Sequence, residues 1–272
     1  MHFEQDDTLV VEMIQVGPHD PLCCPTQPTV LRLAYRDGAL EVVDEWSATI
    51  DAHALGRPVR ALVVPAAAYD NTRAPEGRGE PLHFAWVFDN GTDGNGPPGR
   101  IAVYPVRSYL AMGREAGDPR LAQTLDRLRR LLVERPSHPP PPLPIVPLRN
   151  GTNDLAARVA YLDLGQRGTG MRFVGRFAQD ATPLSNASLR YVFWGLVRNG
   201  EDLVVADLPV RFEPLAVPQA AGDPSFDPAR TRANLDRGTQ LLDAAPASQF
   251  SPGLATLDGL VASVRIVGDH RF

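Results

Sequence analysis

The sequence contains no lysine, and all 27 of its fixed positive side-chain charges are arginines. This absence excludes a Schiff-base lysine, a lysine general base and a phosphate-binding loop of the P-loop type, because each of these needs the amine. Arginine can replace lysine at most surface positions. We therefore interpret the missing lysine as the composition of a GC-rich genome, and it says little about mechanism.

Long apolar runs and a positive net charge are missing too. No apolar run reaches the roughly 18 residues that a membrane-spanning helix needs, so we expect no transmembrane segment. Residues 1–7 are acidic and lack the apolar stretch of a signal peptide, so we expect a cytoplasmic protein or a fragment. The net charge of −5 argues against nucleic acid as a partner.

The apolar and turn patterns predict an α+β fold with a mainly antiparallel sheet. Alternating runs joined by Asp37-Gly38 and Asn199-Gly200 indicate β-hairpins. Helices are expected near 119–134, 228–245 and 252–263, the first opened by Asp118 as N-cap and Pro119. Strands in hairpins, with helices grouped at the ends of segments, are typical of this class.

Two regions are expected. Residues 1–47 form a small β-rich piece with an N-terminal hairpin, and 48–272 form the α+β domain. Residues 136–147 hold seven prolines and favour an extended polyproline II segment. Because Leu143, Ile145, Val146 and Leu148 supply apolar anchors, we expect 136–149 to be a strap across the fold rather than a spacer between domains.

The two cysteines, Cys23 and Cys24, are adjacent. A trans peptide holds neighbouring Cα atoms about 3.8 Å apart, below the usual disulfide range, so a bridge between them would be strained and easily reduced. Three interpretations stay open. The pair is a structural disulfide in an oxidising compartment, a redox or soft-metal site, or two small side chains in a turn.

Other motifs of known chemistry are absent or fail on context. The six histidines are too dispersed for a usual zinc site. The glycines at 94–99 match dinucleotide spacing, but two prolines precede a strand there instead of a helix. The segment 89–100 resembles a calcium loop but ends on Arg100, where a carboxylate is needed. We expect no cofactor and no metal, and we identify no catalytic residue.

One surface is a candidate binding site. If Arg172, Arg176, Arg190 and Trp194 share a sheet face, that face could bind an anion or a glycan through guanidinium forks and a stacking ring. The alternative is that a helix covers Val192, Trp194 and Leu196 while the arginines pair with carboxylates.

Two stretches also resemble known families. The segment 19–28, with its Cys-Cys-Pro-Thr run, resembles the vicinal-cysteine segment near the end of a β-rich module in bacterial envelope lipoproteins. Residues 80–266, notably 170–186 and 189–195, are similar to an uncharacterised bacterial extracytoplasmic domain family. The end at 250–266 is similar in pattern to PsbP/Mog1-like domains. These resemblances imply an envelope location, an α+β fold and no known reaction, and the lack of a signal peptide then suggests N-terminal truncation.

The resulting expectation is a non-enzymatic, envelope-associated domain with a binding or structural role. Its partner would be an unidentified small molecule, glycan or protein. Two enzymatic alternatives are a small hydrolase that uses dispersed carboxylates and a thiol-redox protein that uses Cys23 and Cys24. A deep pocket with converging carboxylates would favour an enzyme.

Overall fold

The structure is a computed structural model that describes residues 2–3, 8–18, 20, 24–70, 72–73, 78–89, 98–147, 152–178, 184–215 and 228–270. The described residues form an α+β fold in which every strand pairing between them is antiparallel, and this confirms the predicted class. Among these residues, no helix has the length and apolar character to cross a membrane.

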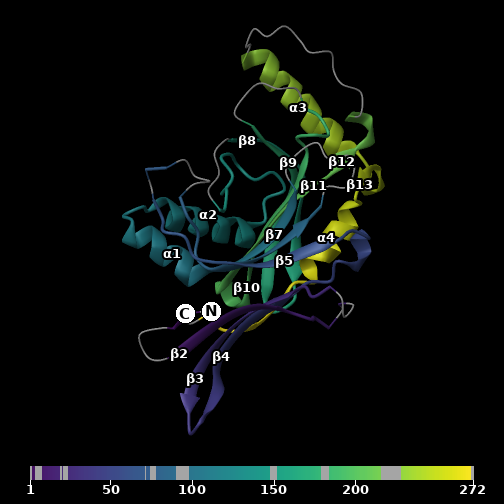
Figure 1. Cartoon of the computed structure of the whole chain (residues 1–272). Coiled ribbons are helices and arrows are strands. Elements are labelled where there is room, and N and C mark those ends of the chain that lie inside the picture. The colour runs from purple at the N-terminus through teal and green to yellow at the C-terminus, as the bar shows by residue number, and fades with distance from the viewer. Residues whose placement is uncertain are drawn as a thin grey trace.

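A seven-stranded sheet forms the centre of the molecule (Figure 1). Side chains on both of its faces are buried, which explains why β10 is apolar with little alternation. Its strands, in spatial order, are β5 (Val59–Val64), β6 (His83–Phe88), β7 (Gly99–Pro105), β11 (Asp202–Pro209), β10 (Arg190–Val197), β9 (Gly168–Ala178) and β8 (Thr152–Leu164).

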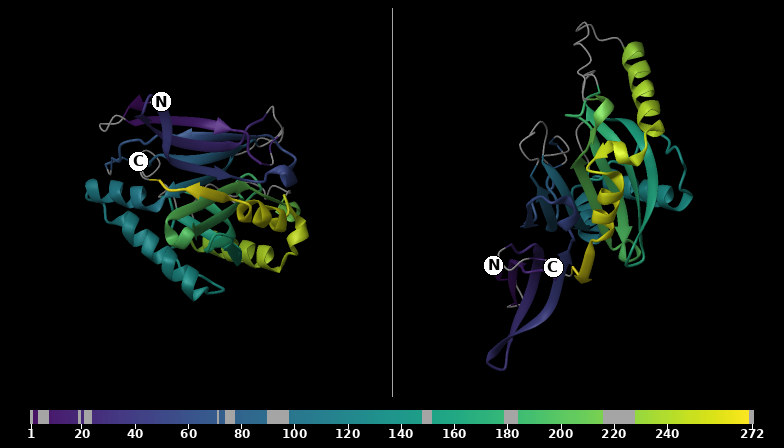
Figure 2. Two further views of the ribbon diagram at one scale, coloured as in Figure 1. Left: turned by 90° about the horizontal axis from the view of Figure 1, so that it is seen from below. Right: turned by 90° about the vertical axis from the view of Figure 1, so that its right-hand side faces the viewer.

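A five-stranded sheet carries the N-terminal residues and one strand from the far end of the chain. Its strands, in spatial order, are β1 (His2–Phe3), β2 (Thr8–Gln15), β3 (Gln27–Arg36), β4 (Ala39–Thr49) and β14 (Arg265–Gly268). The β3–β4 hairpin projects from the body of the molecule (Figures 1 and 2).

The two sheets share one core. Trp46 stacks on Phe84 with ring centroids 3.8 Å apart, and Trp86 Nε1 donates a 2.8 Å hydrogen bond to the carbonyl of Thr26. The boundary expected after residue 47 falls inside β4, and the hydrophobic core is continuous across it. The N-terminal strands therefore form a β-sheet of their own with β14, and its core continues into that of the large sheet.

Both predicted hairpin turns are present. Asp37 and Gly38 have φ angles of 48° and 87°, and Asn199 and Gly200 have angles of 60° and 90°. Asp, Asn and Gly tolerate this left-handed region far better than other residues, which is why these pairs mark the turns.

Two helices cover one face of the large sheet (Figure 1): α1 (Val106–Glu115) and α2 (Arg120–Glu134). Asp118 caps α2, because its Oδ1 accepts a 3.0 Å hydrogen bond from the backbone N–H of Arg120. The leucines of the predicted stripe are buried: Leu121, Leu125, Leu128 and Leu132. Helix α1 was not predicted, since it follows β7 directly and has no side-chain cap.

The opposite face is covered by α3 (Pro228–Ala244) and α4 (Leu254–Ala262), close to the predicted ranges. A small sheet of β12 (Arg211–Phe212) and β13 (Phe250–Ser251) lies beside them. The proline-rich segment is a strap through residue 147, because Leu143 and Val146 are buried in the cluster under α1 and α2. Leu148 lies outside the described residues.

Candidate binding pocket

The four residues expected on one face do not share it. In the β9–β10 pairing, Arg172 lies opposite Phe193 and Trp194 lies opposite Met171. Opposed residues of an antiparallel pair point to the same face, and neighbours along a strand alternate. Arg172 and Arg176 therefore face α3 and α4, and Arg190 and Trp194 face the other way. The expectation of one arginine–tryptophan face is wrong.

These side chains are also buried, with exposed fractions of 8% for Arg172, 1% for Arg176, 6% for Arg190 and 2% for Trp194. Trp194 lies with Val192 and Leu196 in the cluster covered by α2. The Nε of Arg190 donates a 2.6 Å hydrogen bond to Asp207 Oδ1. The geometry matches the alternative, in which a helix covers the face and the arginines pair with carboxylates. The four side chains therefore do not form an exposed binding surface.

Arg172 is held by a network of its own. Its guanidinium pairs with the Asp258 carboxylate at 3.1 Å and also donates to the backbone carbonyl of Arg158. Tyr191 Oη donates to the same carboxylate at 2.9 Å. Burial, followed by the charge and hydrogen bond of Asp258, raises the pKa of Tyr191 well above its usual value. Arg172 and Asp258 therefore neutralise each other under α4.

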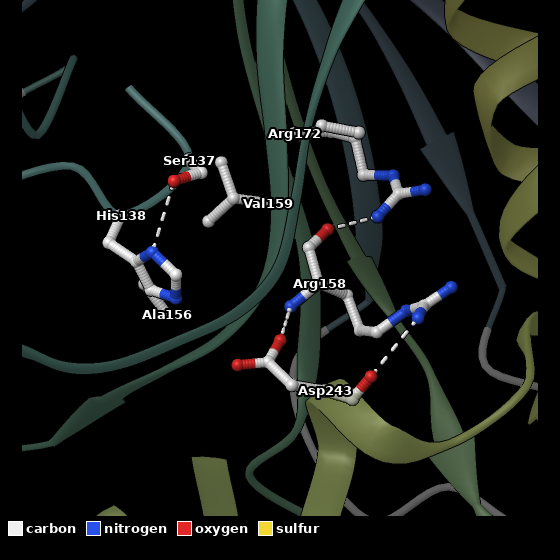
Figure 3. A pocket seen from close by; sticks show the side chains of 8 residues that line it. Ser137, His138, Ala156, Arg158, Val159, Arg172 and Asp243 are labelled. Atoms are coloured by element: carbon white, nitrogen blue, oxygen red, sulfur yellow. Dashed lines mark hydrogen bonds between the residues drawn. The ribbon is translucent and has the colours of Figure 1, made fainter. Parts of the chain in front are cut away.

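A pocket of about 330 Å³ opens at β8, an edge strand of the large sheet (Figure 3). The pairing register of β8 shifts between Ala157 and Ala160, which forms a bulge at the pocket wall. The lining residues come from the strap, from β8 and β9 and from the end of α3: Ser137, His138, Ala156, Arg158, Val159, Ala160, Arg172 and Asp243.

Arg158 is the central residue of this pocket. It sits in the bulge with a φ of 56°. Its backbone N–H donates to Asp243 Oδ1 at 2.5 Å, its carbonyl accepts from Arg172, and its Nη1 donates to the Asp243 carbonyl at 3.2 Å. Its Nε is buried and has no hydrogen-bond partner among the described residues. The backbone is thus fixed while the guanidinium keeps unused donors.

The two arginines of the pocket differ in whether a carboxylate pairs with them. Arg172 already has a carboxylate, whereas no carboxylate forms an ion pair with Arg158 within the described part of the chain. Figure 3 shows both guanidinium groups on one side of β8, with Ser137 and His138 on the other. A half-buried guanidinium without a counter-charge favours binding an anionic group.

Sequence reasoning missed Arg158 and Asp243. Arg158 belongs to an alternating run that reads as an ordinary strand, and Asp243 lies 85 residues further along the chain. No local pattern joins the two residues. Of the predicted candidates, only Arg172 lines this pocket.

Buried carboxylates elsewhere in the described structure do not converge on a cavity. Each lies beside an arginine: Asp118 with Arg120, Asp202 with Arg198, and Asp207 with Arg190. The hydrogen bond from Arg120, the largest favourable contribution, holds the pKa of Asp118 well below its usual range. Burial raises the pKa of Asp202, against the lowering effect of Arg198. These pairings do not favour the hydrolase alternative.

A second polar cluster surrounds His83, which is fully buried in β6. Its Nδ1 donates to the carbonyl of Pro81 at 2.7 Å, and its Nε2 accepts a hydrogen bond from Arg100. Glu80 Oε2 lies 3.4 Å from the same Nε2. Burial lowers the pKa of His83. A ring with no exposed surface cannot meet a substrate, so this cluster supports the fold.

Cys24 lines another pocket, of about 320 Å³, together with His53 and Arg57. Cys24 is exposed, and His53 Nδ1 lies 3.0 Å from Asp51 Oδ1. Cys23 lies outside the described residues, as do His19 and most of the glycine-rich segment at 90–97. The vicinal disulfide therefore stays a prediction. Across the described ranges, no three His, Cys, Asp or Glu side chains gather in a way that could hold a metal ion.

Comparison of the chain with protein-family models, with curated proteins and with solved structures finds no match. The resemblance to bacterial envelope domains therefore stays a prediction, and the geometry of the two pockets is the evidence that bears on function.

Proposed function

We propose that this protein is a non-enzymatic binding domain that holds a small ligand by an anionic group at Arg158. The observation that carries the proposal is the state of this guanidinium. It lines a pocket, its Nε is buried without a partner, and no carboxylate pairs with it in the part of the chain that the structure describes. A carboxylate or a phosphate would supply both the charge and the missing acceptors.

The fixed backbone of Arg158 supports this role. Two other segments hold it, through Asp243 and Arg172, so the guanidinium is positioned before a ligand arrives. Preorganised donors bind with a smaller loss of conformational entropy. By contrast, the described lining of the pocket contains one carboxylate, Asp243, and no pair of acids that could serve as general acid and general base.

The test is a binding titration with two probes that separate the sources of the anionic group. One probe is 4-methylpentanoate, an aliphatic carboxylate, and the other is inorganic phosphate. Isothermal titration calorimetry should detect at least one of them with the unmodified protein. R158Q should weaken the binding of that probe by about tenfold or more, because a charge-assisted hydrogen bond is lost.

The matched control is R129Q, which removes one arginine charge from an exposed site on α2. It should leave the affinity unchanged. Equal affinities of R158Q and the unmodified protein for the bound probe, or no binding of either probe, would contradict the proposal.

The extracytoplasmic location is part of the proposal, and the resemblance to envelope domains supports it. Fractionation of cells of the source organism, followed by immunodetection, would test it. The protein should appear in the envelope or periplasmic fraction. Recovery with cytoplasmic markers alone would contradict this location.

A second candidate function is thiol chemistry at Cys24, favoured by one observation. Cys24 and His53 line the same pocket, and Asp51 orients the His53 ring through Nδ1. A histidine oriented by a carboxylate is the usual activator of a cysteine nucleophile. Slower reaction of Cys24 with a thiol reagent in H53Q would support this function, and an unchanged rate would contradict it.

A further inference from the structure

The pocket holds two opposite charges that do not pair with each other. Arg158 and Asp243 both line it, yet no ion pair forms between the guanidinium and the Asp243 carboxylate. Asp243 Oδ1 accepts from the backbone N–H of Arg158, and no partner is recorded for Oδ2 within the described residues. Each charged group therefore keeps hydrogen-bonding capacity for a third molecule.

Hydrogen bonds to backbone groups hold both charged side chains at the pocket. The backbone N–H of Arg158 donates to the Asp243 side chain, and Nη1 of Arg158 donates to the Asp243 carbonyl at 3.2 Å. These two bonds join β8 to the end of α3 (Figure 3). Both bonds use backbone groups as one partner, so they hold the two side chains beside each other and leave part of each charged group open to a ligand.

We propose that the ligand is a zwitterion, a free α-amino acid with an aliphatic side chain, whose carboxylate binds Arg158 and whose ammonium group binds Asp243. This inference rests on the proposed function, because it uses the same anionic contact at Arg158. It adds a cationic contact at Asp243 and thereby names the class of ligand.

The rest of the lining fits this class. Arg172 is neutralised by Asp258, so Arg158 and Asp243 are the charges that remain for a ligand. Ala156, Val159 and Ala160 give the pocket an apolar wall for an aliphatic side chain. Ser137 and His138 border the pocket from the strap.

A simple anion fits less well. Its charge would lie near the Asp243 carboxylate, and like charges repel in a partly buried site more strongly than in water. A zwitterion replaces this repulsion with a second favourable contact. The pocket should therefore discriminate against the deaminated analogue.

Three molecules of matched shape test the inference: L-leucine, 4-methylpentanoate, which lacks only the amine, and 3-methylbutylamine, which lacks only the carboxylate. Calorimetry or ligand-observed NMR with the full chain should show leucine binding about tenfold or more tighter than either analogue. The D243N variant keeps the Oδ1 acceptor for Arg158 and removes the charge. It should bind leucine and 4-methylpentanoate with similar affinity.

The outcomes separate this inference from the proposed function. If 4-methylpentanoate binds the unmodified protein as tightly as leucine and R158Q weakens both, the zwitterion is wrong and the anionic site stands. If D243N keeps the full preference for leucine, the assignment of Asp243 is wrong. If no molecule of the series binds but inorganic phosphate does, the zwitterion is wrong and the anionic site stands. If phosphate does not bind either, or if the amine binds as tightly as leucine, both proposals are overturned.

Discussion

The backbone N–H of Arg158 donates to Oδ1 of Asp243, and this hydrogen bond ties the bulge of β8 to the end of α3. It joins residues 85 positions apart and places an arginine and an aspartate in one pocket. The bulge unpairs the edge strand at this point and turns a backbone donor toward the helix. The candidate site is therefore a consequence of an irregularity in the sheet.

The Asp258 carboxylate should be important for stability. D258A would leave the Arg172 guanidinium, 8% exposed, buried without a counter-charge and would remove the acceptor of Tyr191. We expect a loss of about 3 kcal/mol or more in the free energy of unfolding by urea. D236A, which breaks an exposed pair with Arg232, should cost less than about 1 kcal/mol. Equal losses in the two variants would contradict this account.

Two glycines should respond to alanine in opposite directions. A Cβ at Gly170 would lie 2.1 Å from the Phe193 ring, so G170A should destabilise the protein by about 1–3 kcal/mol through overpacking. Gly259 lies inside α4 with no atom near its Cβ position, so G259A should stabilise by about 0.5–1 kcal/mol. Thermal unfolding of both variants measures this. A higher melting temperature for G170A would count against the packing described here.

Acidification should destabilise the fold through two histidines, His83, which is buried, and His270, which is half-buried. Burial lowers the pKa of His83 and lowers that of His270 to about 4. A lowered pKa means that the folded state favours the neutral form of the histidine ring. Its contribution is therefore complete above the unfolded pKa of about 6.5 and is lost as the pH falls toward the folded value.

Urea unfolding at pH 7 and pH 5 measures this dependence. H270Q should show a smaller drop in unfolding free energy than the unmodified protein, because one of the depressed groups is gone. H53Q removes an exposed histidine and is the control. The same drop in H270Q and in the unmodified protein would exclude His270 as a source of the acid sensitivity.

The state of the two cysteines has a direct measurement. If Cys23 and Cys24 form a disulfide in an oxidising compartment, alkylation of the exported protein should add mass only after reduction. Intact mass spectrometry with and without reductant gives the answer. Two alkylated thiols without reductant would exclude the disulfide and leave the thiol available for chemistry at Cys24.

Local patterns were enough to predict much of the fold. Asp118 was identified as a cap because a short acidic side chain before a leucine stripe has one favourable place at a helix start. Asp37-Gly38 marked a turn because few residues accept its backbone angles. The pairing of β14 with β4 was not predictable in this way, because it joins the two ends of the chain.

The candidate site could not be predicted without the pairing register of β9 and β10. A shift of one residue between β9 and β10 exchanges the faces, so the sequence alone could not decide whether Arg172 and Trp194 share one. The helices that cover the two faces of the sheet bury both side chains, Arg172 and Trp194. The pocket combines the strap, the β8 bulge and the end of α3, three segments with no common pattern in the sequence.

The most direct test of the account maps the binding of 4-methylpentanoate on the isotope-labelled protein by chemical-shift perturbation. The account predicts saturable shifts at the amides of Arg158, Val159 and Asp243, and their loss in R158Q. Shifts centred on the Cys24 pocket or elsewhere, or the same shifts in R158Q, would contradict the claim that Arg158 holds an anionic ligand.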